Sequence, residues 1–149
     1  MIDKQWIGHA LPASVLPIER SRLQFFAKAI GETDPVYTDD EAARAAGHPA
    51  LPVPPTFLFC LEMDAPNPAA MRQTLGLDYS RILHGEQGFT FHRVVHAGDR
   101  LTFRQRIADI YDKKGGALEF IVRHTEVSNA QGVAVAQLRC VTVYRNPTP

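Results

Sequence analysis

Residues 56–63 read Thr-Phe-Leu-Phe-Cys-Leu-Glu-Met, and they are apolar on nearly every side when placed on a helix. Pro55 suits the first position of that helix, because the N–H that proline lacks would have no partner there. A helix without a polar face is usually buried. The segment therefore predicts a short helix at the centre of the fold.

The chain after residue 80 changes to strand patterning. Its segments are rich in β-branched and aromatic residues and alternate with period two; they span residues 82–94, 100–111, 118–127 and 133–145. Glycine-bearing turn sequences join the later ones. Helices followed by hairpin-linked strands predict an α+β fold with an antiparallel sheet. A buried helix beside such a sheet matches the hotdog fold, an antiparallel sheet wrapped around a central helix.

The chain before the central helix predicts smaller elements. A helix is expected over residues 21–30, with Ser21 as a possible N-cap, although Glu19 could start it earlier, and with Gly31 as its end. A second helix is expected from Thr38 or Asp39 to residue 46. Residues 14–18 predict a short strand, residues 48–55 an irregular proline-rich segment, and residues 64–80 a loop with some helix at 69–75. We expect residues 1–149 to form a single domain.

Composition narrows the functional classes. Lys plus Arg and Asp plus Glu both number 16, so the formal net charge is zero. No basic field points to nucleic acid, no charge run points to a membrane surface, and no apolar run is long enough to cross one. Cys60 and Cys140 stand alone in apolar stretches, typical of buried small side chains rather than a disulfide. Residues 1–6 lack the apolar core of a signal peptide, so we expect a cytoplasmic protein.

A motif upstream of the central helix carries a family resemblance. Residues 26–40 read Phe-Ala-Lys-Ala-Ile-Gly-Glu-Thr-Asp-Pro-Val-Tyr-Thr-Asp-Asp, and Val-Pro-Pro-Thr-Phe follows at 53–57. This resembles the hydratase motif of MaoC-like dehydratases, Gly-Asp-x-Asn-Pro-(aliphatic)-His. Glu32 stands at the Asp position, Asp34 at the Asn position and Tyr37 at the His position. The pattern resembles the FAS1-like, or N-terminal-half, branch, whose members often sit beside a second hotdog with the intact Asp and His.

The resemblance implies a hotdog fold and chemistry on acyl thioesters of coenzyme A or a carrier protein, with no separate cofactor. In the family, the Asp and His activate the water that adds to, or leaves from, the thioester. Tyr37 cannot replace that base, because a phenol titrates near ~10, whereas Glu32 remains a possible base. The alternative is that Glu32 and Asp34 cap or solvate a loop and that Tyr37 packs.

A second candidate pair lies in residues 82–93. Period-two alternation places His84 and Glu86 on one strand face and Gln87 on the other. His84 and Glu86 are then a candidate acid–base pair, and the His-Gly-Glu-Gln segment resembles the same branch. The alternative is a polar network that tethers the strand.

Substrate contacts are expected at the start of the central helix, at Pro55, Thr56 and Phe57, together with Asp34 and Gln87. In the family this entry lies beside the active site, and Thr56 or Phe57 would have to donate an N–H to the thioester oxygen, since prolines cannot. The alternative is a rigid helix start only. The histidines lack paired ligand spacing, so no metal site is predicted.

Three functional hypotheses follow. The first is one half of an (R)-3-hydroxyacyl-thioester dehydratase or 2-enoyl-thioester hydratase. The second is a non-catalytic thioester-binding or scaffold subunit. The third is a self-sufficient homodimer that uses His84 and Glu86. Because an open sheet edge invites pairing, we expect a homodimer or a heterodimer, with residues 82–94 and 133–145 as contact segments.

Overall fold

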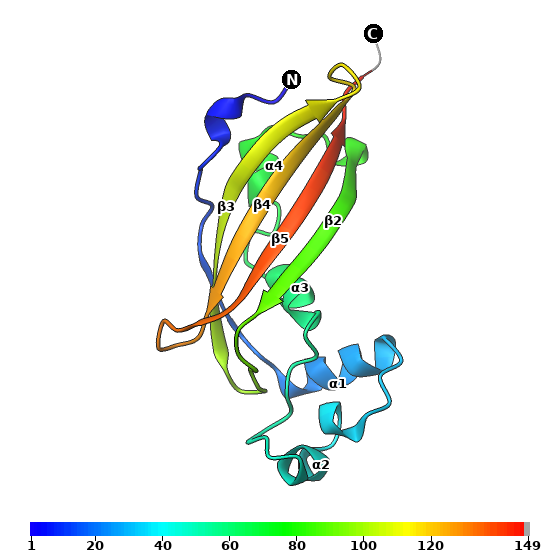
Figure 1. Ribbon diagram of the computed structural model, residues 1–149, viewed down its shortest axis with the longest axis vertical. Coiled ribbons are helices and arrows are strands. Elements are labelled where there is room, and N and C mark those ends of the chain that lie inside the picture. The colour runs from blue at the N-terminus through cyan, green and yellow to red at the C-terminus, as the bar shows by residue number, and fades with distance from the viewer. Residues whose placement is uncertain (148–149) are drawn as a thin grey trace.

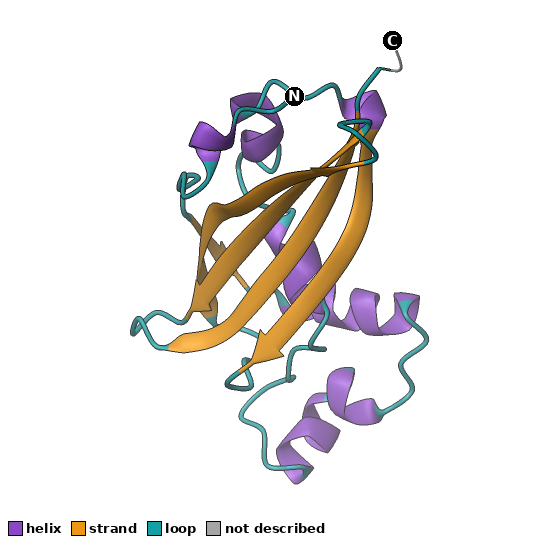
Figure 2. Ribbon diagram, turned by 45° about the horizontal axis from the view of Figure 1, so that its top comes forward, coloured by secondary structure: helices purple, strands orange, loops and turns teal. Residues whose placement is uncertain are grey.

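The computed structural model describes residues 1–147. Five antiparallel strands form one sheet in the order β1-β3-β4-β5-β2. Their bounds are Ser14–Pro17 for β1, Ile82–Phe91 for β2, Arg100–Lys113 for β3, Leu118–Ser128 for β4 and Ala134–Arg145 for β5. The long strands curve side by side (Figures 1 and 2), and α3, Phe57–Glu62, and α4, Ala70–Thr74, lie behind them in Figure 1. This is the α+β arrangement that the sequence predicts.

The central helix is α3, Phe57–Glu62, one residue shorter at each end than expected. Phe57, Leu58 and Leu61 are buried against the sheet. Phe59 and Cys60 are only half-buried, and Met63, just past the helix, is 46% exposed. The expectation of burial on every side was therefore wrong. The open side faces β2, one of the two edge strands, and no further strand lies beyond β2 among the described residues.

Two helices lie beyond one end of the sheet (Figure 1). Helix α1, Arg20–Ala29, follows Glu19, the earlier of the two starts that the sequence allows, and buries Leu23 and Ala27. Helix α2, Asp40–Ala45, is capped by Asp39, whose side chain accepts from the Ala42 N–H. Between them lies the 3₁₀ turn η2, Pro35–Tyr37. Gly31 ends the α1 region with φ +72°, the left-handed backbone expected of a helix stop.

The segment between α3 and β2 holds α4, Ala70–Thr74, within the helical stretch expected there, and the 3₁₀ turn η3, Tyr79–Arg81. The remaining 3₁₀ turn is η1, Lys4–Trp6. Met71 of α4 and Leu77 pack with strand residues Ile107, Ile110 and Ile121 in a second apolar cluster. Within residues 1–147 no helix has the length and apolar character needed to cross a membrane.

Two expectations about the strands need correction. Strand β2 ends at Phe91 rather than at residue 94, because the N–H groups of His92 and Arg93 both turn to the carbonyl of Val135. Strand β5 lies between β4 and β2, so residues 133–145 are not a sheet edge. Of the two segments expected to contact a partner, only β2 has an open edge.

Candidate active site

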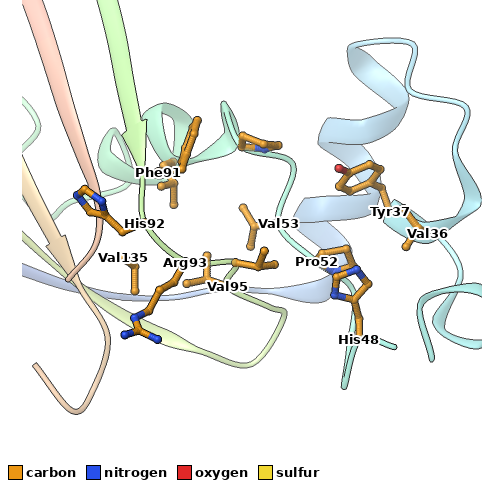
Figure 3. A pocket seen from close by; sticks show the side chains of 13 residues that line it. Val36, Tyr37, His48, Pro52, Val53, Phe91, His92, Arg93, Val95 and Val135 are labelled. Atoms are coloured by element: carbon orange, nitrogen blue, oxygen red, sulfur yellow. The ribbon is translucent and has the colours of Figure 1, made fainter. Parts of the chain in front are cut away.

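A cavity of about 380 Å³ lies beside the start of α3. We call it the Tyr37 cavity. Figure 3 shows Tyr37 and His48 on one side of it and Phe91, His92 and Arg93 on the other. The remaining lining is mostly aliphatic: Val36, Pro52, Val53, Pro55, Leu58, Val94, Val95 and Val135. An apolar hollow with a few polar side chains is the usual form of a small-molecule site.

The motif residues Glu32, Asp34 and Tyr37 have different surroundings. Glu32 Oε1 accepts hydrogen bonds of 2.9 Å from the N–H groups of Thr33 and Asp34. Asp34 Oδ1 accepts from the Val36 N–H at 3.0 Å and caps η2. Both carboxylates therefore accept backbone N–H groups of the loop. Of these three residues, only Tyr37 lines the cavity.

An imidazole missed by the sequence analysis also lines this cavity. His48 Nδ1 lies 3.1 Å from His96 Nε2. The backbone N–H of His96 donates to Asp99 Oδ2 at 2.9 Å. Burial lowers the pKa of His96. The nearby Asp99 carboxylate opposes this shift, and His48 adds to it. In one of the two tautomers, the Nδ1–H of His48 donates a hydrogen bond to Nε2 of a neutral His96, and His48 Nε2 then has a free lone pair.

The substrate contacts expected at the start of α3 differ in their exposure: two of the three residues are exposed and one is buried. Pro55 lines the Tyr37 cavity and is exposed, as is Thr56. Phe57 is buried against Phe26, with ring centroids 5.3 Å apart, and its N–H donates to the Pro54 carbonyl at 2.9 Å. Phe57 therefore cannot offer an N–H to a thioester. Within residues 1–147 the Thr56 N–H makes no hydrogen bond, so it remains the available donor.

The open side of α3 forms an apolar hollow with β2, which we call the α3–β2 groove. It is lined by Phe26, Thr56, Phe59, Cys60, His84, Gln87 and Phe89. The His84 ring meets the Phe59 ring edge to face, with centroids 5.5 Å apart. Burial raises the pKa of the Cys60 thiol, so the groove offers no thiolate at neutral pH.

The expectation that His84 and Glu86 share a strand face was wrong. His84 pairs with Thr142 and Glu86 with the adjacent Val141, so Gly85 is an extra residue in a β-bulge. His84 therefore faces α3 together with Gln87. Glu86 points to the outer face, where its Oε2 accepts from Arg139 Nη1 at 2.5 Å. The two side chains cannot act on the same substrate atom.

A buried polar cluster beneath α3 was also missed. Glu62, 2% exposed, accepts from Gln105 Nε2 at 3.0 Å, Thr125 Oγ1 at 2.5 Å and Arg123 Nη2 at 2.9 Å. Its carboxylate ties the end of α3 to β3 and β4. The signal was present in the sequence, because Glu62 is the only charged residue of the central helix.

Among residues 1–147 no group of three or more His, Cys, Asp or Glu side chains is arranged to hold a metal ion. Neither Cys60 nor Cys140 forms a disulfide, and Cys140 is buried.

The chain matches the model of the FAS1-like dehydratase domain region over residues 5–138. A UPF0336 protein of Saccharopolyspora erythraea is 36% identical over 145 residues, covering 97% of this chain and 92% of that protein. The chain therefore belongs to the FAS1-like dehydratase family, as the motif at residues 26–40 indicated.

Solved structures place the fold among hotdog dehydratases. The HadBC (3R-hydroxyacyl-ACP dehydratase) complex from Mycobacterium tuberculosis matches with a TM-score of 0.78 and 24% identity, over 92% of this chain and 96% of that chain. A MaoC-like dehydratase matches with a TM-score of 0.83 and 23% identity, over 95% of this chain but only 42% of that chain. The hotdog fold is confirmed.

Proposed function

We propose that this chain is the acyl-thioester-binding half of an (R)-3-hydroxyacyl-thioester dehydratase or 2-enoyl-thioester hydratase. The observation that carries the proposal is Tyr37. It occupies the position of the motif's histidine and lines a cavity at the start of α3, yet it cannot serve as a base near neutral pH. On this proposal the chain keeps the motif and the cavity of a thioester site but lacks the Asp–His pair that transfers the proton in the resembled family.

The geometry suits binding of the substrate. The Tyr37 cavity, with Pro55 on its wall, is the proposed place for the thioester, and Arg93 at its rim suits the phosphates of coenzyme A or of a carrier-protein arm. The α3–β2 groove is the proposed place for the acyl chain. Water addition or removal needs proton transfer only, so we propose no cofactor beyond the coenzyme A or carrier arm of the substrate.

The missing pair would come from a second hotdog subunit. Strand β2 has ten residues, and its outer edge has no strand partner among residues 1–147. Leu83 on this strand is 47% exposed, and Tyr79 just before it is 77% exposed. The HadBC structure is a complex, and the longer MaoC-like chain is less than half covered by this one. Both support a unit with more than one hotdog.

A second candidate function is that of a self-sufficient hydratase. One observation favours it: His48 puts an imidazole in the Tyr37 cavity. His84 and Glu86 do not support it as a pair, because they lie on opposite faces. In this candidate, His48 Nε2 would be the base and His96 would orient it.

One assay separates the two. Hydration of crotonyl-CoA and of a longer enoyl-CoA is measured with the purified chain alone, then with a hotdog protein that carries the intact motif. The binding-half proposal expects little turnover alone and turnover with the partner. Robust turnover by the chain alone, abolished in His48→Gln, would replace it with the second candidate.

A further inference from the structure

A second cavity, of about 310 Å³, adjoins the Tyr37 cavity, and we call it the Arg100 cavity. Both cavities are lined by the same four residues along a shared wall: Arg93, Val94, Val95 and Val135. The two cavities are therefore neighbours, so a long ligand bound in one can extend into the other.

The lining of the Arg100 cavity carries more positive than negative charge. Arg93 and Arg100 contribute two guanidinium groups, and neither forms an ion pair within residues 1–147. Asp99 contributes a carboxylate, but its Oδ2 already accepts from the His96 N–H at 2.9 Å. Two unpaired cations on one cavity wall favour the binding of a negatively charged group beside them.

Backbone contacts determine where the two arginines lie. The Arg93 N–H donates to the Val135 carbonyl at 3.2 Å, which holds Arg93 beside the start of β5. Arg100 is the first residue of β3 and pairs with Pro17 of β1. Figure 3 shows the Arg93 side chain extending away from Tyr37. Its guanidinium is therefore better placed for a group in the Arg100 cavity than for one beside Tyr37.

The turn between β4 and β5, at residues 129–131, completes the lining. Asn129 Oδ1 accepts from the N–H groups of Gln131 and Val133, at 3.1 Å and 2.9 Å. The acceptor atom of Asn129 is thus used inside the turn, whereas its Nδ2 makes no hydrogen bond within residues 1–147 and remains an available donor. Guanidinium and amide donors together suit a ligand group that is rich in acceptor oxygens.

We propose that the Arg100 cavity binds a phosphate group of the arm that carries the thioester, while the thioester itself lies in the Tyr37 cavity. Arg93 and Arg100 neutralise the phosphate, because the planar guanidinium matches phosphate oxygens in both charge and geometry. Asn129 Nδ2 donates to a further phosphate oxygen. Coenzyme A and the arm of a carrier protein both contain such a phosphate. This inference rests on the proposed function and gives the ligand's phosphate a site of its own.

The test is calorimetry on the full chain with three thioesters that share the acyl group and differ in phosphate. Butyryl-pantetheine has none, butyryl-phosphopantetheine has the phosphate common to both sources, and butyryl-CoA adds those of the nucleotide. The wild type is expected to bind butyryl-phosphopantetheine roughly threefold to tenfold more tightly than butyryl-pantetheine, as for partly exposed charged hydrogen bonds. Arg93→Gln with Arg100→Gln should bring that ratio close to one.

The matched control is Arg104→Gln, because Arg104 is an exposed arginine of the same strand as Arg100 and lines neither cavity. It should keep the wild-type ratio. A gain confined to butyryl-CoA, and lost in the double variant, would support the site and assign its phosphate to the nucleotide of coenzyme A.

Two other results would contradict the proposal in different ways. Equal wild-type affinity for all three esters, or a ratio that the double variant leaves unchanged, would overturn this inference alone. Failure of all three esters to bind, with and without a hotdog partner, would overturn the proposed function, and the inference with it.

Discussion

His84 and Glu86 are two positions apart in β2 but lie on opposite faces of the sheet. The bulge at Gly85 breaks the alternation between them. His84 is thereby turned toward Phe59 of α3 and Glu86 toward Arg139 on the outer face. The relationship removes one candidate acid–base pair and places a histidine in the groove.

The bulge needs glycine at position 85. A Cβ there would lie 2.9 Å from Val143 Cγ2 and 3.1 Å from the Val141 carbonyl oxygen. Gly85→Ala is expected to lower the free energy of unfolding by roughly 1–3 kcal/mol, the usual range for overpacking. Urea denaturation measures the change. Gly88→Ala is the control, because its Cβ would meet nothing closer than 3.8 Å. Equal stability of the two variants would contradict the account of the bulge.

The His48–His96 pair predicts an acid-sensitive stability. Burial lowers the folded-state pKa of His96 below its ordinary value of 6.5. As pH falls through 6.5, the unfolded chain takes up this proton before the folded chain does, so stability falls. The urea midpoint of the wild type should therefore drop more than that of His96→Gln between about pH 7.5 and about pH 5.5. His9→Gln, an exposed histidine, should behave like the wild type. If the urea midpoint of His96→Gln fell as much as that of the wild type, the proposed contribution of His96 to acid sensitivity would be contradicted.

Restoring the family's pair tests the role of Tyr37. We expect the wild-type chain alone to be a poor hydratase, and Glu32→Asp with Tyr37→His to raise its turnover of enoyl-CoA. A positioned general base contributes roughly 10²–10⁴-fold in rate. Tyr37→Phe is the control and should give no rise. Wild-type turnover that the double variant leaves unchanged would show that the base lies elsewhere, and His48 would then be the residue to remove.

The open edge of β2 predicts a dimer with the two sheets side by side. Leu83→Lys places a charge at that edge, and charged residues discourage strand pairing there. The molar mass of the variant, measured by light scattering at micromolar concentration, should be closer to that of a monomer than the wild-type value. Val15→Lys in the edge strand β1 is the control. Val15 is also exposed, at 54%, but β1 has only four residues, so the same charge there should leave the dimer unchanged. A wild-type monomer, both alone and with a hotdog partner, would contradict the assembly.

The fold was predictable because its signals are local. The apolar run at residues 56–63 and the alternating segments after it specify α3 and the strands without knowledge of distant contacts. The helix cap at Asp39 and the helix end at Gly31 likewise depend on single residues that the sequence shows directly. By contrast, the end of β2 depends on the Val135 carbonyl, which lies more than forty residues away. The single domain expected for residues 1–149 stays a prediction, and residues 148–149 lie outside the described part.

The site was less predictable, because its contacts join distant parts of the chain. His48 and His96 are brought together by tertiary packing, as are Glu62 and Arg123. A glycine within a strand pattern can mark a bulge or an ordinary position, so alternation alone assigned Glu86 to the wrong face. The motif comparison singled out Tyr37, which lines the cavity. It could not show that Glu32 and Asp34 bind backbone N–H groups rather than the cavity.

The most direct test of the central claim is the binding of coenzyme A, butyryl-CoA and octanoyl-CoA to the purified chain by calorimetry. If the α3–β2 groove holds the acyl chain, affinity should rise along this series, by up to ~0.8 kcal/mol for each methylene buried. Phe59→Ser, which removes an aromatic wall of the groove, should flatten the rise. Equal affinity for all three ligands, or no binding with a hotdog partner present, would contradict a thioester-binding function and leave the chain only a scaffold role.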